Sequence, residues 1–280
     1  MQFNNLKEHL KNSTIVDQFI YINLIVFVLA FMVNTVAFLN NQQSNFIIDY
    51  FALSKDDSIY FYKPYTFISY GFLHIGFIHL LFNLIALYYL GNLFLNFFSK
   101  KQFVIYYILG SVFGGILFVI SYHYFPVFKN NQGVLLGASA SISALLVGLA
   151  THAPNYEINL RFIGFVKIWK LTLAYIILTI ILIPNGNAGG QIAHLGGAFI
   201  GYLLTLYFAN QKEKPYKKSH SNLKMIYKAK EKSDDFGLSV HQKKIIHQRK
   251  VDAILDKISK SGYDSLTKTE RDFLANASKK

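Results

Sequence analysis

Residues 193–208 read AHLGGAFIGYLLTLYF and residues 137–150 read GASASISALLVGLA, and these two stretches decide the fold. Both are too apolar to be anything but membrane helices, yet His194 lies in one and Ser139 near the start of the other. Polar side chains at membrane depth are costly, so they usually face a bundle interior or a wet cavity and mark function. A third polar cluster, HLLFN at residues 79–83, opens another apolar stretch. The three clusters supply a hydroxyl, an imidazole and an amide, which suit a nucleophile, a base and an oxyanion donor.

The hydropathy pattern predicts six membrane helices, because about 20 apolar residues cross a bilayer as a helix. These are expected at residues 18–39, 74–98, 103–122, 139–152, 168–183 and 191–208. The fourth is too short, since roughly 14 residues at about 1.5 Å each cannot cross about 30 Å of hydrocarbon. We therefore expect Ser139 at the floor of a cavity below the outer surface. The fold class is an all-α polytopic membrane protein, a six-helix bundle with a short helical tail.

The distribution of basic residues predicts the orientation. Six helices place both termini on one side of the membrane. The first sixteen residues are polar, and no A-x-A cleavage site follows the first apolar run, so we expect that run to remain as a membrane anchor. With the N-terminus inside, the inner segments before the tail carry Lys7, Lys11, Lys100, Lys101, Arg161, Lys167 and Lys170, and the outer loops carry Lys55, Lys63 and Lys129. The positive-inside rule then favours cytoplasmic termini and a site that opens to the outer side.

The net charge of +13 belongs mostly to the C-terminal part, because residues 211–280 carry +9 and residues 1–210 carry +4. A basic stretch beside a membrane helix indicates cytoplasmic orientation and attraction to anionic lipid. No nucleic-acid recognition motif accompanies it, so we expect no nucleic-acid partner. We expect a membrane domain at 1–210, a basic linker at 211–247 and a small helical hairpin at 248–280. The hairpin contains the capping box TKTE, and no partner for this tail can be read.

Small residues surround both candidate catalytic side chains. Gly137 precedes Ser139 and lets the backbone approach a substrate, and a helix N-terminus favours developing negative charge. The alternative is an ordinary N-cap serine. Gly197 and Gly201 follow His194 at helical spacing and form a groove for a close-packed partner helix. The alternative for His194 is a proton relay or an ion site.

The fourth helix offers a face for that groove, with Ser141, Ala144 and Gly148 in register. Such packing would bring His194 within hydrogen-bond reach of Ser139. A serine paired with a histidine is activated as a nucleophile without a metal.

His79 and Asn83 are four residues apart and share a helical face. Each can donate a hydrogen bond to an oxyanion, together with the backbone N–H of Ser139. The alternative is polar packing between helices. His74 lies five residues before His79 with no H-E-x-x-H pattern, and cysteine is absent, so we expect no metal site.

The order and spacing of G-x-S at 137–139, A-H-x-x-G-x-x-x-G at 193–201 and H-x-x-x-N at 79–83 resemble the rhomboid family of intramembrane serine proteases. The resemblance covers about residues 15–210, and KPYTFISYGFLHIGFIHLLFN at 63–83 is similar to the family's first loop and second helix. It implies Ser139 as nucleophile and His194 as base and then acid. It also implies His79 and Asn83 in the oxyanion hole, and His74 as a structural histidine near the site. The implied partners are transmembrane protein substrates within the lipid bilayer, with no cofactor and no carboxylate in a triad.

Four positions depart from the family pattern. Ala140 replaces a common glycine, Tyr65 replaces a loop tryptophan, and LGNLFLNF at 90–97 lacks a common glutamate. Ser143 stands where an aromatic residue often packs on the catalytic histidine. We therefore expect another side chain to orient His194.

Two other functions remain open. A catalytically inactive relative would bind transmembrane clients and control their trafficking or degradation. A small transporter or channel would use His79, Asn83 and His194 as a polar path, and an inverted repeat would favour it, but no convincing repeat occurs. The Asn-rich and Lys-rich composition suggests a bacterial plasma membrane.

Overall fold

The computed structural model describes residues 13–42, 45–56, 61–129, 133–160, 164–210, 251–252, 254–259 and 262–277. The chain divides into two compact units, residues 1–212 and 213–280. The predicted basic linker at 211–247 lies outside the described residues. The first unit contains the long helices α2 (Ile15–Leu39), α6 (Phe77–Phe94), α7 (Lys100–Tyr124), α8 (Ser139–His152), α9 (Ile168–Ile181) and α10 (Ala188–Asn210).

A helix lies at each of the six predicted positions, with one notable difference in a boundary. Helix α6 begins at Phe77 and not at residue 74, so His74 lies in the loop before it. Gly76 precedes this helix with a φ of +80°, a conformation that a helix cannot continue through. Capping boxes begin α2, at Thr14 and Asp17, and α7, at Ser99 and Gln102.

The loops contain short elements that the hydropathy pattern did not predict. Between α2 and α6 lie α3 (Phe46–Phe51), β1 (Leu53–Ser54), α5 (Thr66–Ser69) and the 3₁₀ turn η1 (Tyr70–Phe72). Between α7 and α8 lie η2 (Pro126–Phe128) and β2 (Val134–Leu135), and β2 pairs antiparallel with β1. A hairpin of β3 (Glu157–Leu160) and β4 (Gly164–Lys167) joins α8 to α9. The β1–β2 pair thus ties the backbone just before Ser139 to the first loop.

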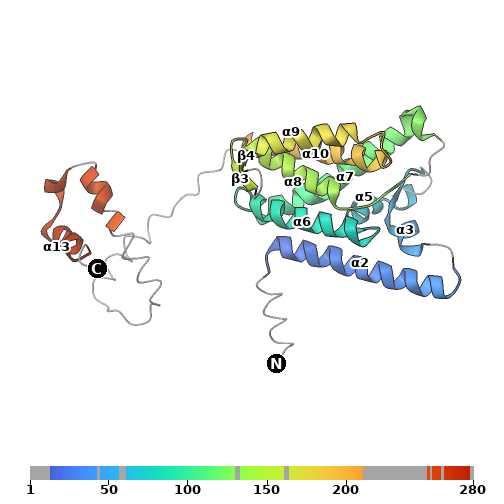
Figure 1. The fold of residues 1–280 in the computed structure, drawn as a ribbon, viewed down its shortest axis with the longest axis horizontal. Helices are drawn as coiled ribbons and strands as arrows, with labels where there is room; N and C mark the ends of the chain where they lie inside the picture. Colours follow the sequence, from blue (N-terminus) through green and yellow to red (C-terminus); the bar gives the residue numbers. More distant parts are fainter. Residues whose placement is uncertain are drawn as a thin grey trace, which may run out of the picture. The chain divides into compact units, whose positions relative to one another are not determined.

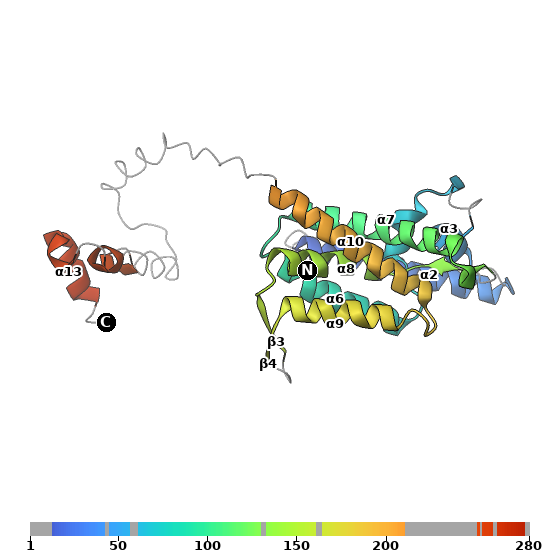
Figure 2. The ribbon, with the colours of Figure 1, turned by 90° about the horizontal axis from the view of Figure 1, so that it is seen from above.

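Helix α8 lies in the middle of the bundle, where α6, α7, α9 and α10 all contact it (Figures 1 and 2). Close packing here depends on small residues, as is usual for helices in membranes. An added Cβ at Gly110 of α7 would lie 2.8 Å from the Cα of Ser141. Helix α10 packs equally close on α7, because a Cβ at Gly196 would lie 2.6 Å from the carbonyl oxygen of Phe113.

A buried hydrogen-bond network around Tyr107 holds the loop before α6 against the bundle. The Tyr107 hydroxyl donates to the carbonyl of Gly71 (3.0 Å) and accepts from Asn23 of α2 (3.2 Å). The Ser141 hydroxyl donates to the backbone carbonyl of Tyr107 (2.6 Å). Buried polar groups in a membrane bundle need such partners, and here they join α2, α7, α8 and η1 beside the candidate site.

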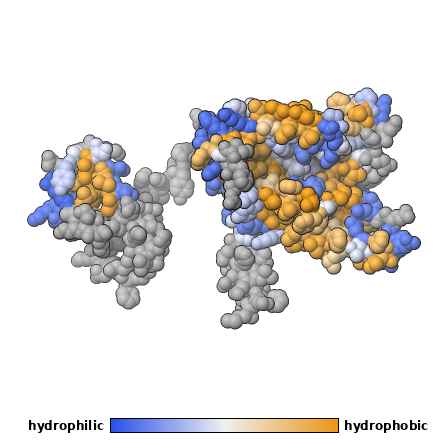
Figure 3. All heavy atoms as spheres, viewed as in Figure 1, coloured by the Kyte–Doolittle hydropathy of each residue, from blue (hydrophilic) through white to orange (hydrophobic). Residues whose placement is uncertain are grey.

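The outer faces of the helices are hydrophobic. Among the described helices, α2, α6, α7 and α10 are long and apolar enough to cross a membrane, and α8 and α9 are shorter apolar helices. Large side chains such as Phe31, Tyr89 and Ile181 are exposed on this surface. Figure 3 shows hydrophobic residues over the middle of the face in view and hydrophilic ones nearer its ends. Such extensive apolar exposure is typical of a surface that lipid covers.

The second unit contains η3 (Tyr263–Ser265) and α13 (Lys268–Ala277), and residues 251–252 and 254–259 are also helical. The predicted capping box is confirmed, since a Glu270 carboxylate oxygen accepts from the Thr267 backbone N–H (2.7 Å). Lys257 forms an ion pair with the same carboxylate (2.9 Å). The Lys257 ammonium and Thr267 lower the pKa of Glu270 to about 2, because both stabilise its charged form.

Candidate active site

Ser139 is the first residue of α8, and Ala138 occupies the N-cap position without a side-chain cap hydrogen bond. The interpretation of Ser139 as an ordinary N-cap serine is therefore wrong. Gly137 has a φ of +117°, which favours glycine, and its N–H donates to the carbonyl of Tyr70 (2.9 Å). This turn leaves Ser139 half-buried at an uncapped helix N-terminus, where backbone N–H groups are available to an anion.

A cavity of about 410 Å³ lies in front of this helix end. It is lined from α6 by His79 and Asn83, from α8 by Ser139 and from α10 by His194. The structure therefore brings together the four side chains that the sequence singled out from three separate segments. Within the described ranges, no group of three or more His, Asp or Glu residues could hold a metal ion.

The predicted packing of α10 on α8 is confirmed at Gly197 and Gly201. A Cβ at Gly197 would lie 2.0 Å from the carbonyl oxygen of Ala140, and one at Gly201 would lie 2.3 Å from that of Ala144. The expected face of α8 was partly wrong, because Ser141 faces α7 and bonds the hydroxyl of Ser111 (2.7 Å). Ala140, one residue earlier and about 100° away around the helix, takes that place against α10.

No hydrogen bond joins the Ser139 hydroxyl to His194 among the described residues, although both side chains line the same cavity. Catalytic hydrogen bonds are often long in the free state and tighten when substrate binds. The Nδ1 atom of His194 is buried and also has no hydrogen-bond partner in the described part of the chain.

His79 and Asn83 line the cavity from α6. A Cβ at Gly137 would lie 2.8 Å from the His79 ring, so the ring sits beside the turn that leads to Ser139. The Asn83 amide donates one hydrogen to the backbone carbonyl of His79 (3.0 Å). Its NH₂ group carries a second hydrogen, which could serve a ligand in the cavity.

His74 also contacts the turn that leads to Ser139. It is buried, and its Nε2 atom accepts from the backbone N–H of Ala138 at 3.4 Å, just before the candidate nucleophile. Its ring meets the His79 ring edge-on, with centroids 5.1 Å apart. This geometry suits the structural role expected for His74.

Tyr175 of α9 is a site residue that the sequence reasoning missed. Its ring lies nearly parallel to that of His194, with centroids 6.2 Å apart and an interplanar angle of 26°. Its hydroxyl is hydrogen-bonded to the hydroxyl of Ser143 on α8. The unusual Ser143 signalled that another side chain was needed, but no local pattern marks Tyr175 as that residue.

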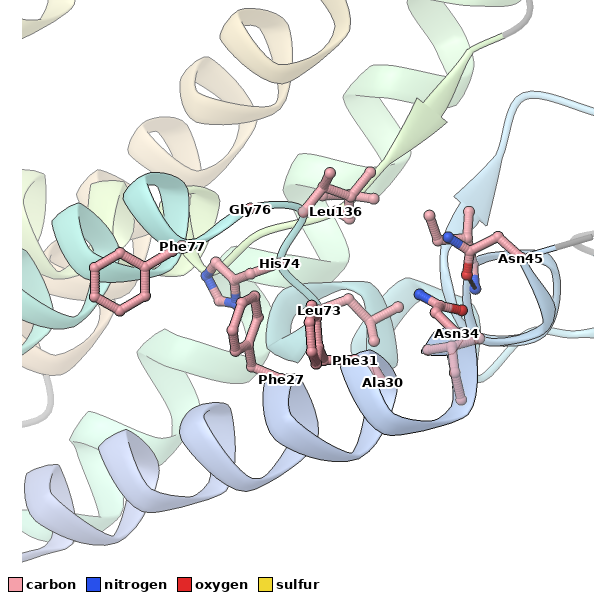
Figure 4. A pocket seen from close by; sticks show the side chains of 13 residues that line it. Phe27, Ala30, Phe31, Asn34, Asn45, Leu73, His74, Gly76, Phe77 and Leu136 are labelled. Carbon is pink, nitrogen blue, oxygen red and sulfur yellow. Dashed lines mark hydrogen bonds between the residues drawn. The ribbon is translucent and has the colours of Figure 1, made fainter. Parts of the chain in front are cut away.

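A second cavity, of about 460 Å³, lies on the α2 side of His74. Figure 4 shows Asn34 and Asn45 at one end of it and His74 and Phe77 at the other. Its lining comes from α2, α3 and the loop before α6, and Leu136 lines this cavity as well as the first. Leu136 thus lies between the candidate active site and an apolar space beside α2.

The first unit is thus a bundle of apolar helices in which a half-buried serine at a helix N-terminus and a histidine of another helix line the same cavity. A family model described as the Rhomboid domain matches residues 62–211, more than half of the chain. The chain therefore belongs to the rhomboid family, a family of intramembrane proteases, and is an integral membrane protein. A second model, described as a family of unknown function (DUF6576), matches residues 239–280. Comparison with curated proteins gives no significant match.

Proposed function

We propose that this rhomboid-family protein is an intramembrane serine endopeptidase with Ser139 as nucleophile and His194 as general base. The observation that carries the proposal is the single cavity that holds both side chains in front of the uncapped N-terminus of α8. Such an arrangement combines a nucleophile, a base and oxyanion donors without a metal.

In the proposed mechanism the Ser139 oxygen attacks the carbonyl carbon of the scissile peptide while its proton passes to His194. The negative charge that develops on the carbonyl oxygen is stabilised by the backbone N–H of Ser139 together with His79 and Asn83. The C–N bond then breaks, the leaving amine takes the proton from His194, and an acyl-enzyme remains. Water attacks this ester, gives its proton to His194 and releases the acid, and Ser139 recovers its proton.

The substrates that fit this site are single-span membrane proteins. The scissile backbone must leave its helix to reach Ser139, and unpaired backbone groups are tolerated at membrane depth only where protein or water surrounds them. The cavity in front of the helix end provides that environment, because it is surrounded by protein and includes the polar side chains of His79, Asn83 and His194. We therefore expect cleavage near the outer interface, in segments that unwind easily.

The proposed topology has six membrane helices, with both termini in the cytoplasm of a bacterium and the cavity open to the outer side of the plasma membrane. The four long helices span the bilayer fully. Helices α8 and α9 have 14 residues each and are about 21 Å long at about 1.5 Å per residue, so neither crosses the full hydrocarbon thickness of about 30 Å. The basic tail then lies on the side where anionic lipid is found.

A client-binding protein without proteolytic activity is the second candidate. The missing hydrogen bond between Ser139 and His194 in the described structure is the observation that favours it. The two functions differ in one respect that can be measured, which is whether Ser139 is an activated nucleophile.

Labelling of the purified full-length protein with a fluorescent fluorophosphonate tests this directly. We expect the wild type to be labelled, and Ser139→Ala and His194→Ala to lose the label. Ser121→Ala is the control, because Ser121 is buried in α7 and its hydroxyl bonds the carbonyl of Phe118. Equal labelling of Ser139→Ala would contradict the proposal. An unlabelled wild type, under conditions that label an active rhomboid protease, would favour client binding.

A further inference from the structure

His194 is in contact with an aromatic ring from another helix, and no hydrogen bond orients its inner nitrogen. Its Nδ1 atom is buried without a partner among the described residues, so no carboxylate or carbonyl there fixes the imidazole. The Tyr175 ring lies against it in a nearly parallel arrangement. With the ring centroids 6.2 Å apart, the two rings are offset, and such a neighbour limits rotation of the imidazole and adds attraction between the two aromatic systems.

The Tyr175 hydroxyl is held by a chain of hydrogen bonds that ends on the candidate nucleophile's own backbone. The Ser143 hydroxyl donates to the carbonyl of Ser139 (2.7 Å). A serine hydroxyl has a single hydrogen, so Ser143 must accept from Tyr175 in the bond between their hydroxyls. The ring beside the base is therefore anchored to the residue that carries the nucleophile.

Helix α9 packs on α8 and α10 but buries few of its own side chains. Its buried residues are Ile168, Thr172 and Thr179, and much of its remaining surface is apolar and exposed. Within the described residues, the bond from Tyr175 to Ser143 is the only side-chain hydrogen bond between α9 and another helix. The position of this ring consequently depends on whether α9 is packed on α8.

We propose that Tyr175 is the positioning residue of His194 and that Ser143 is its anchor, so that the base is aligned only while α9 is packed on α8. This inference rests on the proposed function, because it concerns His194 as the general base. This inference also explains Ser143. Its small side chain leaves room for the Tyr175 ring of α9, and its hydroxyl forms the hydrogen bond that anchors this ring. Tyr175 acts through His194 and not on the substrate.

The test measures the maximal inactivation rate, kinact, and the half-saturating concentration, KI, of a fluorescent fluorophosphonate on the full-length protein. A misaligned base slows the chemical step, so Tyr175→Leu should lower kinact by about 10-fold to 100-fold with KI unchanged. Tyr202→Leu is the matched control, because Tyr202 is an exposed tyrosine of α10, away from the cavity. Its kinact should equal that of the wild type.

Two further variants examine the anchor. Tyr175→Phe and Ser143→Ala each remove one side of the same hydrogen bond, so each should lower kinact, and the double variant should lower it no further. Additive effects would overturn the anchoring role. Tyr175→Phe and Ser143→Ala both keep an aromatic ring at position 175. They therefore test the anchoring role even if thermal unfolding shows that Tyr175→Leu is unstable.

A variant that moves the aromatic ring from α9 to α8 distinguishes positioning of His194 from a purely structural role of Tyr175. In Tyr175→Ala combined with Ser143→Tyr the ring comes from α8, and we expect kinact above that of Tyr175→Ala alone. No gain would overturn the inference. Wild-type kinact in Tyr175→Leu would also overturn it, and would leave the proposed function intact as long as Ser139→Ala abolishes labelling. An unlabelled wild type would remove both proposals.

Discussion

A single methyl group added at Gly197 tests the arrangement of the whole site. An ideal Cβ there would lie 2.0 Å from the carbonyl oxygen of Ala140 and 2.7 Å from its carbonyl carbon. Ordinary contact begins at 3.4 Å, so α10 and α8 must move apart by about 1.4 Å at this point. The atoms that the methyl group meets belong to the backbone, so no side-chain rotation can relieve the clash.

The displacement affects both proposed catalytic side chains, because His194 is one helical turn before Gly197 and Ser139 directly precedes Ala140. A misplacement of about 1 Å can cost about 100-fold in rate. Overpacking of a tight core also costs about 1–3 kcal/mol of stability. We expect Gly197→Ala to be labelled by a fluorophosphonate about 100-fold more slowly than the wild type, and to unfold at a lower temperature in detergent.

The matched control is Ala209→Val, which adds bulk at an exposed position near the end of the same helix. Its labelling rate and unfolding temperature should be those of the wild type. If Gly197→Ala also kept the wild-type rate and unfolding temperature, the close approach of α10 to α8 would be refuted, and with it the explanation of how His194 reaches the cavity.

Two more predictions follow from backbone conformation and from charge. Gly137→Ala should abolish labelling, because its φ is +117° and the new Cβ would lie 2.8 Å from the His79 ring. Gly186→Ala is the control, because Gly186 has a φ of +111° and an added Cβ would meet no atom within 4 Å, so this variant measures the backbone strain alone, about 1–3 kcal/mol. Equal effects of the two variants on labelling would contradict the proposed clash with His79. In the tail, the pKa of Glu270 is lowered to about 2, so its contribution to stability is complete above the ordinary carboxyl pKa near 4.5 and is lost as the pH falls toward 2. Hydrogen exchange of α13 in the full-length protein, corrected for the intrinsic pH dependence of exchange, should therefore become faster as the pH falls through that range. The Glu270→Gln variant should show no such change. Unchanged protection of the wild type would count against the ion pair with Lys257.

The positions of the six helices could be predicted from the sequence because hydropathy and capping are local properties of the chain. The apolar runs that contain Ser139 and His194 mark helices wherever they pack. The spacing of Gly197 and Gly201 also predicted a close helix partner, since small residues at that interval make a groove on any helix. The capping box at Thr267 is a local signal of the same kind, and the structure contains it.

Contacts between helices depend on how each helix is rotated and how deep it lies, and no local pattern records either quantity. Ser141 and Ala140 are neighbours in the chain, yet packing turned the first toward α7 and the second toward α10. The pairing of β1 with β2 joins segments about eighty residues apart, which hydropathy alone does not relate. Tyr175 is the clearest case: Ser143 departs from the rhomboid pattern and left the support of His194 unassigned, and only the packing of α9 on α8 and α10 placed the Tyr175 ring beside it.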